Sequence, residues 1–143
     1  MPTRNASAVW EGGLKTGTGS FKGESGAIGG AYSFSSRFES GEGSNPEEML
    51  AAAEAACYSM AFSGALERNG TPPKSVDTSA KCTVERVNDA FTITRIELEV
   101  NAVVPSIDDA TFQKLAAQAR DTCPVSRALK GNVDIQLNAK LAS

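Results

Sequence analysis

The pattern of apolar and polar positions predicts strands at both ends of the chain, with helices and further strands between them. In residues 1–43, aromatic residues alternate with ten of the 13 glycines of the whole sequence. This arrangement is typical of short strands joined by glycine turns. We expect three strands here, near residues 6–11, 17–24 and 31–39.

A long helix is predicted to follow Gly43. The segment Ser44-Asn45-Pro46-Glu47-Glu48 combines a capping residue, a proline for the first turn and early carboxylates, and the run MLAAAEAACYSMAFSGALERNG continues it. Gly70 should end the helix. One stripe at helical spacing holds small and apolar residues, so we expect this stripe to be buried. Its members are Leu50, Ala53, Cys57 and Met60 or Gly64.

The second half alternates apolar and polar residues in two runs, 76–84 and 96–104, which predicts two more strands. Phe91 and Ile93 have the opposite phase to the second run, so we expect a bulge near Thr94. The segment Ser106 to Asp109 resembles a capping box that starts another helix.

The apolar face of this later helix includes Phe112 and Ala119. Pro124 must interrupt it, which leaves Cys123 at a break and a fresh helical turn through Leu129. A strand over residues 133–141 completes the chain. The order βββ-α-ββ-α-β predicts an α+β fold, and 143 residues suit a single domain spanning 1–143.

Charge and hydropathy exclude several kinds of partner. The net charge is -3 and no run of like charges exceeds two residues, so we expect no nucleic-acid partner. No stretch approaches the roughly 20 apolar residues of a membrane span, and the first residues lack the apolar core of a signal peptide. We therefore expect no membrane partner and a soluble, cytoplasmic protein.

The cysteines are candidates for chemistry, and the sequence has three of them and no histidine. Histidine-dependent catalytic triads and the common zinc sites are excluded, and three cysteines alone make a poor metal site. We expect neither a metal nor another cofactor. Cys82 lies on the inward face of a predicted strand and is interpreted as structural. Cys57 in mid-helix could be only a small buried hydrophobe.

Cys123 is the more suggestive thiol by local physics, because unpaired amides at a helix start favour a thiolate. Two thiols far apart in sequence can still meet if their helices pack together. A reactive thiolate also needs a cation, and without histidine this must be an arginine or a lysine. The candidates are Arg37, Lys74, Arg86, Arg95, Arg120 and Arg127.

Three segments resemble the OsmC branch of the OsmC/Ohr family of peroxiredoxin-like hydroperoxide reductases. They are AVWEG, SRFESGEGSNPEEMLAAAEAACYSMA and ARDTCPVSRALKG. The resemblance runs from Trp10 nearly to the carboxyl terminus. It implies an OsmC-like fold and an intertwined homodimer with central helices packed between or against sheets.

The same resemblance implies a role for each candidate residue. Cys57 becomes the thiol that attacks a hydroperoxide, and Cys123 resolves its sulfenic acid as a disulfide. Arg37 stabilises the Cys57 thiolate, and Glu47 orients Arg37. The implied partners are an organic hydroperoxide, a second copy of the chain and a dithiol reductant, for which a lipoylated protein is one candidate.

Helix geometry adds a constraint on this site. Along a straight helix, Glu47 and Cys57 lie about 15 Å apart and roughly 80° around the axis. Either the helix breaks between them, or they meet across the two-fold axis of a dimer. Two alternative functions remain open at this point: a non-catalytic osmotic or oxidative stress protein with the same fold, and another thiol-disulfide enzyme.

Overall fold

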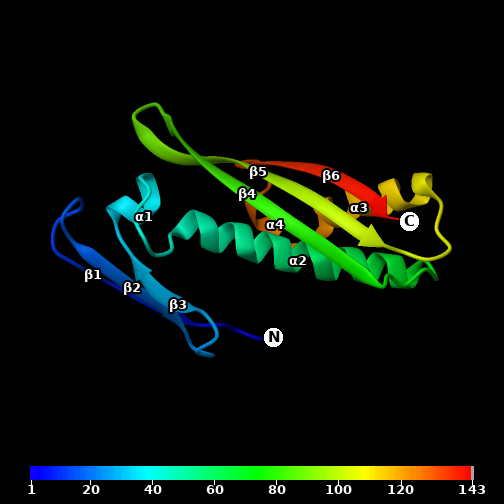
Figure 1. Cartoon of the computed structure of the whole chain (residues 1–143), viewed down its shortest axis with the longest axis horizontal. Coiled ribbons are helices and arrows are strands. Elements are labelled where there is room, and N and C mark those ends of the chain that lie inside the picture. The colour runs from blue at the N-terminus through cyan, green and yellow to red at the C-terminus, as the bar shows by residue number, and fades with distance from the viewer. Residues whose placement is uncertain (143) are drawn as a thin grey trace. The chain divides into compact units, whose positions relative to one another are not determined.

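The computed structural model describes residues 1–142, and the chain divides into two compact units, Met1–Met49 and Leu50–Ser143 (Figure 1). The predicted α+β class is confirmed, and the prediction of a single domain stays a prediction. The elements in chain order are β1 (Ala6–Glu11), β2 (Thr18–Gly23), β3 (Gly29–Tyr32), α1 (Phe34–Phe38), α2 (Pro46–Arg68), β4 (Ser75–Val87), β5 (Ala90–Val103), α3 (Asp109–Thr122), α4 (Pro124–Leu129) and β6 (Asp134–Ala142).

The first unit is an antiparallel sheet with the order β1-β2-β3. Aromatic rings pack across it: the ring centroids of Trp10 and Tyr32 lie 5.4 Å apart, and those of Phe21 and Tyr32 lie 6.1 Å apart. The close approach of these rings explains the glycines, because a Cβ at Gly19 would lie 2.5 Å from the Tyr32 ring. The first two predicted strands are confirmed.

The third predicted strand, 31–39, is wrong beyond Tyr32, because Phe34–Phe38 form the helix α1. A capping box made by two serines starts this helix. The Ser33 side chain accepts from the Ser36 main-chain N–H at 3.0 Å, and the Ser36 side chain accepts from the Ser33 N–H at 2.8 Å. The Ser36 hydroxyl also donates to the Ser44 carbonyl at 2.7 Å, which ties α1 to the segment that precedes α2.

Helix α2 begins and ends where the sequence predicts. The Asn45 side chain accepts from the Glu48 N–H at 2.7 Å, and Pro46 opens the first turn. At the other end, Gly70 adopts a φ of 83°, and the N–H groups of Gly70 and Thr71 donate to the Glu67 and Leu66 carbonyls. This pair of hydrogen bonds is the Schellman motif, which needs a residue that tolerates positive φ.

The second sheet has the order β4-β5-β6, with β4 antiparallel and β6 parallel to β5. Asn88 and Asp89 both have positive φ in the two-residue turn between β4 and β5, as a type I′ turn requires. Thr83 pairs with Arg95 and Val84 with Ile93, so Thr94 is the extra residue of a bulge. The predicted bulge near Thr94 is confirmed.

Helices α2 and α3 supply the core side chains that cover one face of this second sheet (Figure 1). Phe62 of α2 packs on Phe112 of α3 with ring centroids 5.2 Å apart, and the Tyr58 hydroxyl donates to the Ala116 carbonyl at 3.0 Å. By length and composition alone, α2 would also qualify as a membrane-spanning helix, a test that core helices of soluble proteins pass as well. The buried sheet residues are Ile96, Leu98, Val100, Ala102 and Ala139.

The buried stripe of α2 differs from the prediction. Tyr58, Phe62 and Leu66 are fully buried, whereas Met60 of the predicted stripe is 79% exposed. Alanines surround much of this helix, so the small residues do not mark one face. The large side chains occupy the core because they bury more apolar area.

Helix α3 also starts later than predicted. Its cap is Asp108, whose side chain accepts from the Thr111 N–H at 2.9 Å, and Ser106 lies in a turn with a φ of 67°. The predicted break before Pro124 is confirmed, because Cys123 has an extended ψ of 130° between α3 and α4.

Phe62→Ala should lower the free energy of unfolding by about 3–5 kcal/mol, because it removes a fully buried ring from the contact between α2 and α3. Chemical denaturation measures the change. Phe91→Ala is the matched control, since Phe91 is 52% exposed, and it should cost less than about 1 kcal/mol. Equal losses in the two variants would contradict the assignment of the core.

Candidate active site

Two of the three cysteines meet in the second unit. Cys57 lies on α2 and is partly exposed, while Cys123 is fully buried at the junction of α3 and α4. Cys123 lies close enough to Cys57 to raise the pKa of its thiol, both by a side-chain interaction and by charge. The expectation that separate helices bring these thiols together is therefore confirmed.

The surroundings of Cys57 favour its neutral form. Burial raises the pKa of the Cys57 thiol most, and the side-chain interaction with Cys123 and the charge of Glu54 raise it further. One contact, with the main chain of Val125, lowers it. A reactive Cys57 thiolate therefore needs a cation.

The main chain at the start of α4, which was expected to act on Cys123, interacts with Cys57. The Cys123 side chain makes no capping hydrogen bond to the start of α4, and the main chain of Val125 in the first turn of α4 interacts with Cys57. The first turn of α4 therefore lowers the pKa of the Cys57 thiol, which lies on α2. The expectation from local sequence, that the start of this helix favours a Cys123 thiolate, stays a prediction.

Glu54 completes this cluster, and the sequence interpretation missed it. Its side chain is fully buried, and its Oε1 accepts from the Ser126 hydroxyl at 2.5 Å and from the Cys123 thiol at 3.8 Å. Within residues 1–142, Oε2 is buried without a hydrogen-bond partner. The available signal was a lone glutamate in the alanine-rich run, one turn before Cys57.

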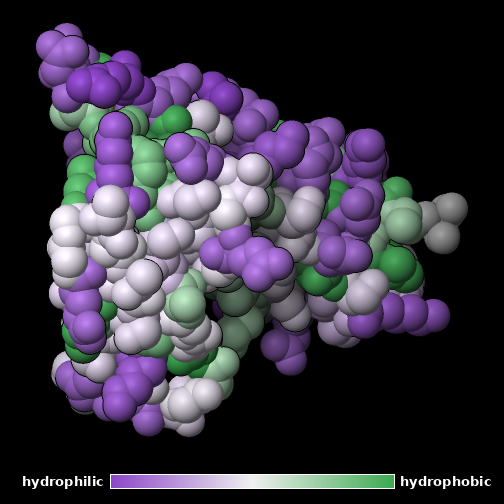
Figure 2. All heavy atoms as spheres, turned by 60° about the vertical axis from the view of Figure 1, so that its left-hand side comes forward, coloured by the Kyte–Doolittle hydropathy of each residue, from purple (hydrophilic) through white to green (hydrophobic). Residues whose placement is uncertain are grey.

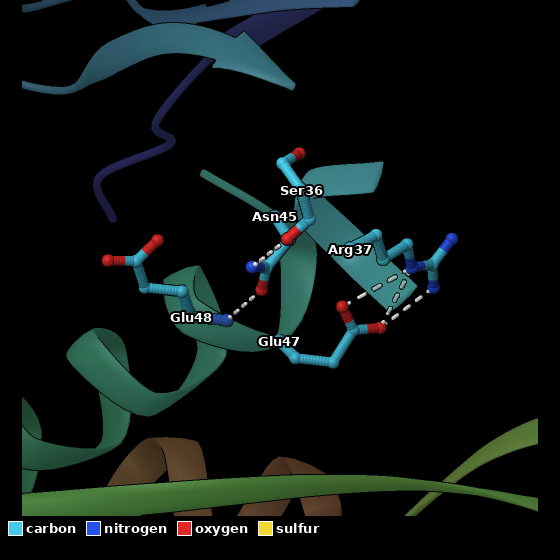
Figure 3. Close-up of polar contacts among 5 residues, drawn as sticks. All are labelled: Ser36, Arg37, Asn45, Glu47 and Glu48. Carbon is cyan, nitrogen blue, oxygen red and sulfur yellow. Dashed lines mark hydrogen bonds and ion pairs between the residues drawn. The ribbon is translucent and has the colours of Figure 1, made fainter. Parts of the chain in front are cut away.

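Arg37 and Glu47 form a second pair, within the first unit (Figure 3). Arg37 Nη2 and Nε lie 2.8 and 3.0 Å from Glu47 Oε1, and Nε lies 3.2 Å from Oε2. The Glu47 side chain is only 7% exposed and that of Arg37 is 37% exposed. The predicted pairing of Glu47 with Arg37 is confirmed as a contact, and the catalytic role of each residue stays a prediction.

The support of this ion pair comes from both ends of the loop between α1 and α2. The Asn45 amide donates to the Ser36 carbonyl at 3.0 Å, while its oxygen caps α2 at Glu48 (Figure 3). Arg37 also stacks over Phe38, with the guanidinium carbon 5.0 Å from the ring centroid. The guanidinium is thus oriented by a carboxylate and by an aromatic ring.

An apolar cavity of about 240 Å³ lies beside Arg37 in the first unit. Four aromatic rings and one aliphatic side chain form most of its wall, and the arginine supplies the charged edge. A cavity of this kind suits a small apolar molecule that carries one polar group. The lining residues are Trp10, Leu14, Tyr32, Ser33, Phe34, Phe38 and Arg37.

Other residues considered from the sequence lie outside these clusters. Cys82 packs against the core from β4, as expected for a structural cysteine. Arg120 pairs with Asp121 at 3.1 Å and lowers the pKa of Tyr58, which burial raises overall. Over residues 1–142 no group of three His, Cys, Asp or Glu side chains is placed to hold a metal ion.

Comparison with known proteins places this arrangement in a family. The family model described as OsmC-like protein matches residues 39–138, which is more than half of the chain. The chain belongs to the OsmC family.

Named relatives and solved structures of the OsmC family agree with this assignment. Peroxiredoxin OsmC of Escherichia coli (strain K12) is 41% identical over 138 residues, covering 96% of each chain. An organic hydroperoxide resistance protein of Xanthomonas axonopodis pv. citri is 32% identical over 98 residues, covering 68% of this chain and 67% of the relative. The crystal structure of OhrB of Bacillus subtilis superimposes with a TM-score of 0.75 at 24% identity, covering 95% of this chain and 98% of that one, which supports the fold.

The proximity of the two OsmC-family thiols predicts a disulfide. Mild oxidation of the reduced protein should join Cys57 to Cys123, because these two side chains lie close together. Peptide mass spectrometry identifies the pairing. A major product that contains Cys82 would contradict the geometry.

Proposed function

We propose that this OsmC-family protein reduces organic hydroperoxides, and hydrogen peroxide less efficiently, through a Cys57 sulfenic acid and a Cys57–Cys123 disulfide. The protein is a peroxidase-like enzyme of the peroxiredoxin type, in line with the names of its relatives. The observation that carries the mechanism is the proximity of the two thiols, seen in the effect of Cys123 on the pKa of Cys57. The apolar cavity beside Arg37 supports an organic substrate.

The proposed reaction has two chemical steps. The Cys57 thiolate attacks one oxygen of the hydroperoxide, the O–O bond breaks, and an alcohol leaves as Cys57 becomes a sulfenic acid. The Cys123 sulfur then attacks the Cys57 sulfur, the S–O bond breaks and water leaves. A dithiol reductant returns both cysteines to thiols by exchange, and a lipoylated protein is one candidate for this role.

Arg37 is the cation that we assign to the Cys57 thiolate. The contacts around Cys57 raise its pKa overall, so the first step needs a positive charge to favour ionisation. Glu47 holds the guanidinium by three short contacts and orients it. A paired arginine keeps its charge at every physiological pH, and its planar group can still face a sulfur or an oxygen.

A homodimer is part of the proposal. Helix α2 is continuous from Pro46 to Arg68, so it does not break between Glu47 and Cys57. The remaining alternative is that these two residues meet across the two-fold axis of a dimer. In that alternative, Arg37 and Glu47 of one subunit act on Cys57 of the other across a two-fold axis. Exposed apolar side chains are consistent with a second copy. Met60 of α2 is 79% exposed, and hydrophobic residues are interspersed with polar ones on the surface in Figure 2.

The proposed chemistry also bears on where the protein works. Recycling of the Cys57–Cys123 disulfide requires a reducing compartment, so we place the protein in the cytoplasm. The sulfur chemistry is complete with a hydroperoxide and a dithiol, so the proposal includes neither a metal nor another cofactor.

Cys57→Ser should abolish the consumption of cumene hydroperoxide, and Cys123→Ser should allow one turnover before the sulfenic acid accumulates, because only the resolving thiol is missing. Peroxide assays with cumene hydroperoxide and hydrogen peroxide, with mass spectrometry of the product, measure both. Cys82→Ser is the control and should remain active. If Cys57→Ser consumes peroxide as fast as the parent, the proposed function is wrong.

Arg37→Met and Cys57→Ser should each be inactive alone, yet their mixture should regain about a quarter of the parent activity per subunit after dissociation and reassociation. Half of the random dimers are mixed, and each of these then carries one site with both Arg37 and Cys57. Peroxidase assays on the mixture and light scattering on the parent measure activity and mass. An inactive mixture of confirmed mixed dimers, or a fully active monomer, would exclude a site across the two-fold axis.

A further inference from the structure

A buried carboxylate lies where the proposed mechanism needs a proton acceptor. Glu54 Oε1 receives hydrogen bonds from the Cys123 thiol at 3.8 Å and from the Ser126 hydroxyl. Oε1 makes both contacts, with Cys123 at the junction of α3 and α4 and with Ser126 on α4. Its second oxygen, Oε2, is buried without a partner among residues 1–142.

The resolving step requires a base at this place. Cys123 is fully buried, and a thiol attacks only after its proton has left. Within the cluster the Cys123 proton points to Glu54, since the thiol donates to Oε1. Glu54 also lies three residues before Cys57 on α2, a spacing at which helical side chains are neighbours.

We propose that Glu54 is the general base of the resolving step, and later the acid that completes it. Glu54 takes the proton from Cys123, whose sulfur forms the S–S bond as the S–O bond of the Cys57 sulfenic acid breaks. The departing hydroxide takes the same proton from Glu54 and leaves as water, so Glu54 returns to its starting form. This inference rests on the proposed function, because a hydroperoxide must first produce the sulfenic acid.

Glu54→Gln keeps the size of the side chain and removes its ability to accept a proton. In a single turnover with cumene hydroperoxide, we expect disulfide formation to slow by about 100-fold or more. The preceding sulfenic acid, captured with a dimedone-type reagent, should form at least as fast as in the parent. The negative charge of Glu54 raises the pKa of Cys57, so its removal does not impede that first step.

A rise in pH distinguishes a base from a purely structural residue. Disulfide formation in Glu54→Gln should accelerate with pH toward the parent rate, since hydroxide can then remove the proton of Cys123. The titratable or charged groups near the cluster include Cys57 and Tyr58 on α2 and Arg120 on α3. Asp121, Lys130 and Asp134 line a pocket together with Ser126, and all of these groups are unchanged in the variant. A rate that stays low at every pH would indicate a packing defect and would overturn the proposal.

Two controls complete the experiment. Glu67→Gln removes an exposed glutamate from the same helix and should leave both steps unchanged. Glu54→Asp and Glu54→Asn are the second control, a pair of variants with side chains of equal size, and they replace Glu54→Gln if that variant folds poorly. The Asp variant should form the disulfide faster than the Asn variant. If the parent and Glu54→Gln form the disulfide at equal rates, and Glu54→Asp and Glu54→Asn also do, the role of Glu54 is wrong. The proposed function would then still stand. A parent protein that forms no Cys57–Cys123 disulfide from peroxide would refute the proposed function and this inference together.

Discussion

The packing of α2 against β5 positions the chemistry of the second unit. Tyr58, Phe62 and Leu66 recur every four residues and are fully buried, and each contributes about 1.5–3 kcal/mol by burial. The same spacing extended one turn toward the start of the helix reaches Glu54. The hydrophobic contact that stabilises the fold therefore also carries a carboxylate into the interior, and it holds Cys57 next to the turn that contains Cys123.

The proposed site combines a cysteine that lacks a nearby positive charge, Cys57, with a cation, Arg37. Burial, Cys123 and Glu54 all oppose a charged Cys57, so this cysteine is a poor nucleophile in its own surroundings. Arg37 is held ready by Glu47 and by the Phe38 ring. In the proposed mechanism, the guanidinium of Arg37 supplies the positive charge that these surroundings lack. Under that proposal, formation of the Cys57 thiolate depends on bringing Arg37 to the sulfur.

Local rules explain which parts of the fold the sequence predicted. Asn45, Gly70 and Pro124 act through their own backbone or side chain, and the structure places a cap, a helix end and a break at these residues. The bulge at Thr94 followed from a change of phase. Helix α1 was missed because its capping box uses a second serine, Ser36, in place of the usual Glu or Gln. The site was predictable where the family motifs mark it, while Glu54 lacked any motif and needed the packed structure to show its neighbours.

The physical cost of Glu54 is itself an argument about its role. A buried polar group that lacks a hydrogen-bond partner costs about 1–3 kcal/mol, and Glu54 Oε2 is such a group among the described residues. An apolar side chain of similar volume is often at least as stable in such a place. Stability therefore does not explain a glutamate at this position of α2. Contact with the thiol that must lose a proton does explain it, because proton transfer is a task that no apolar side chain performs.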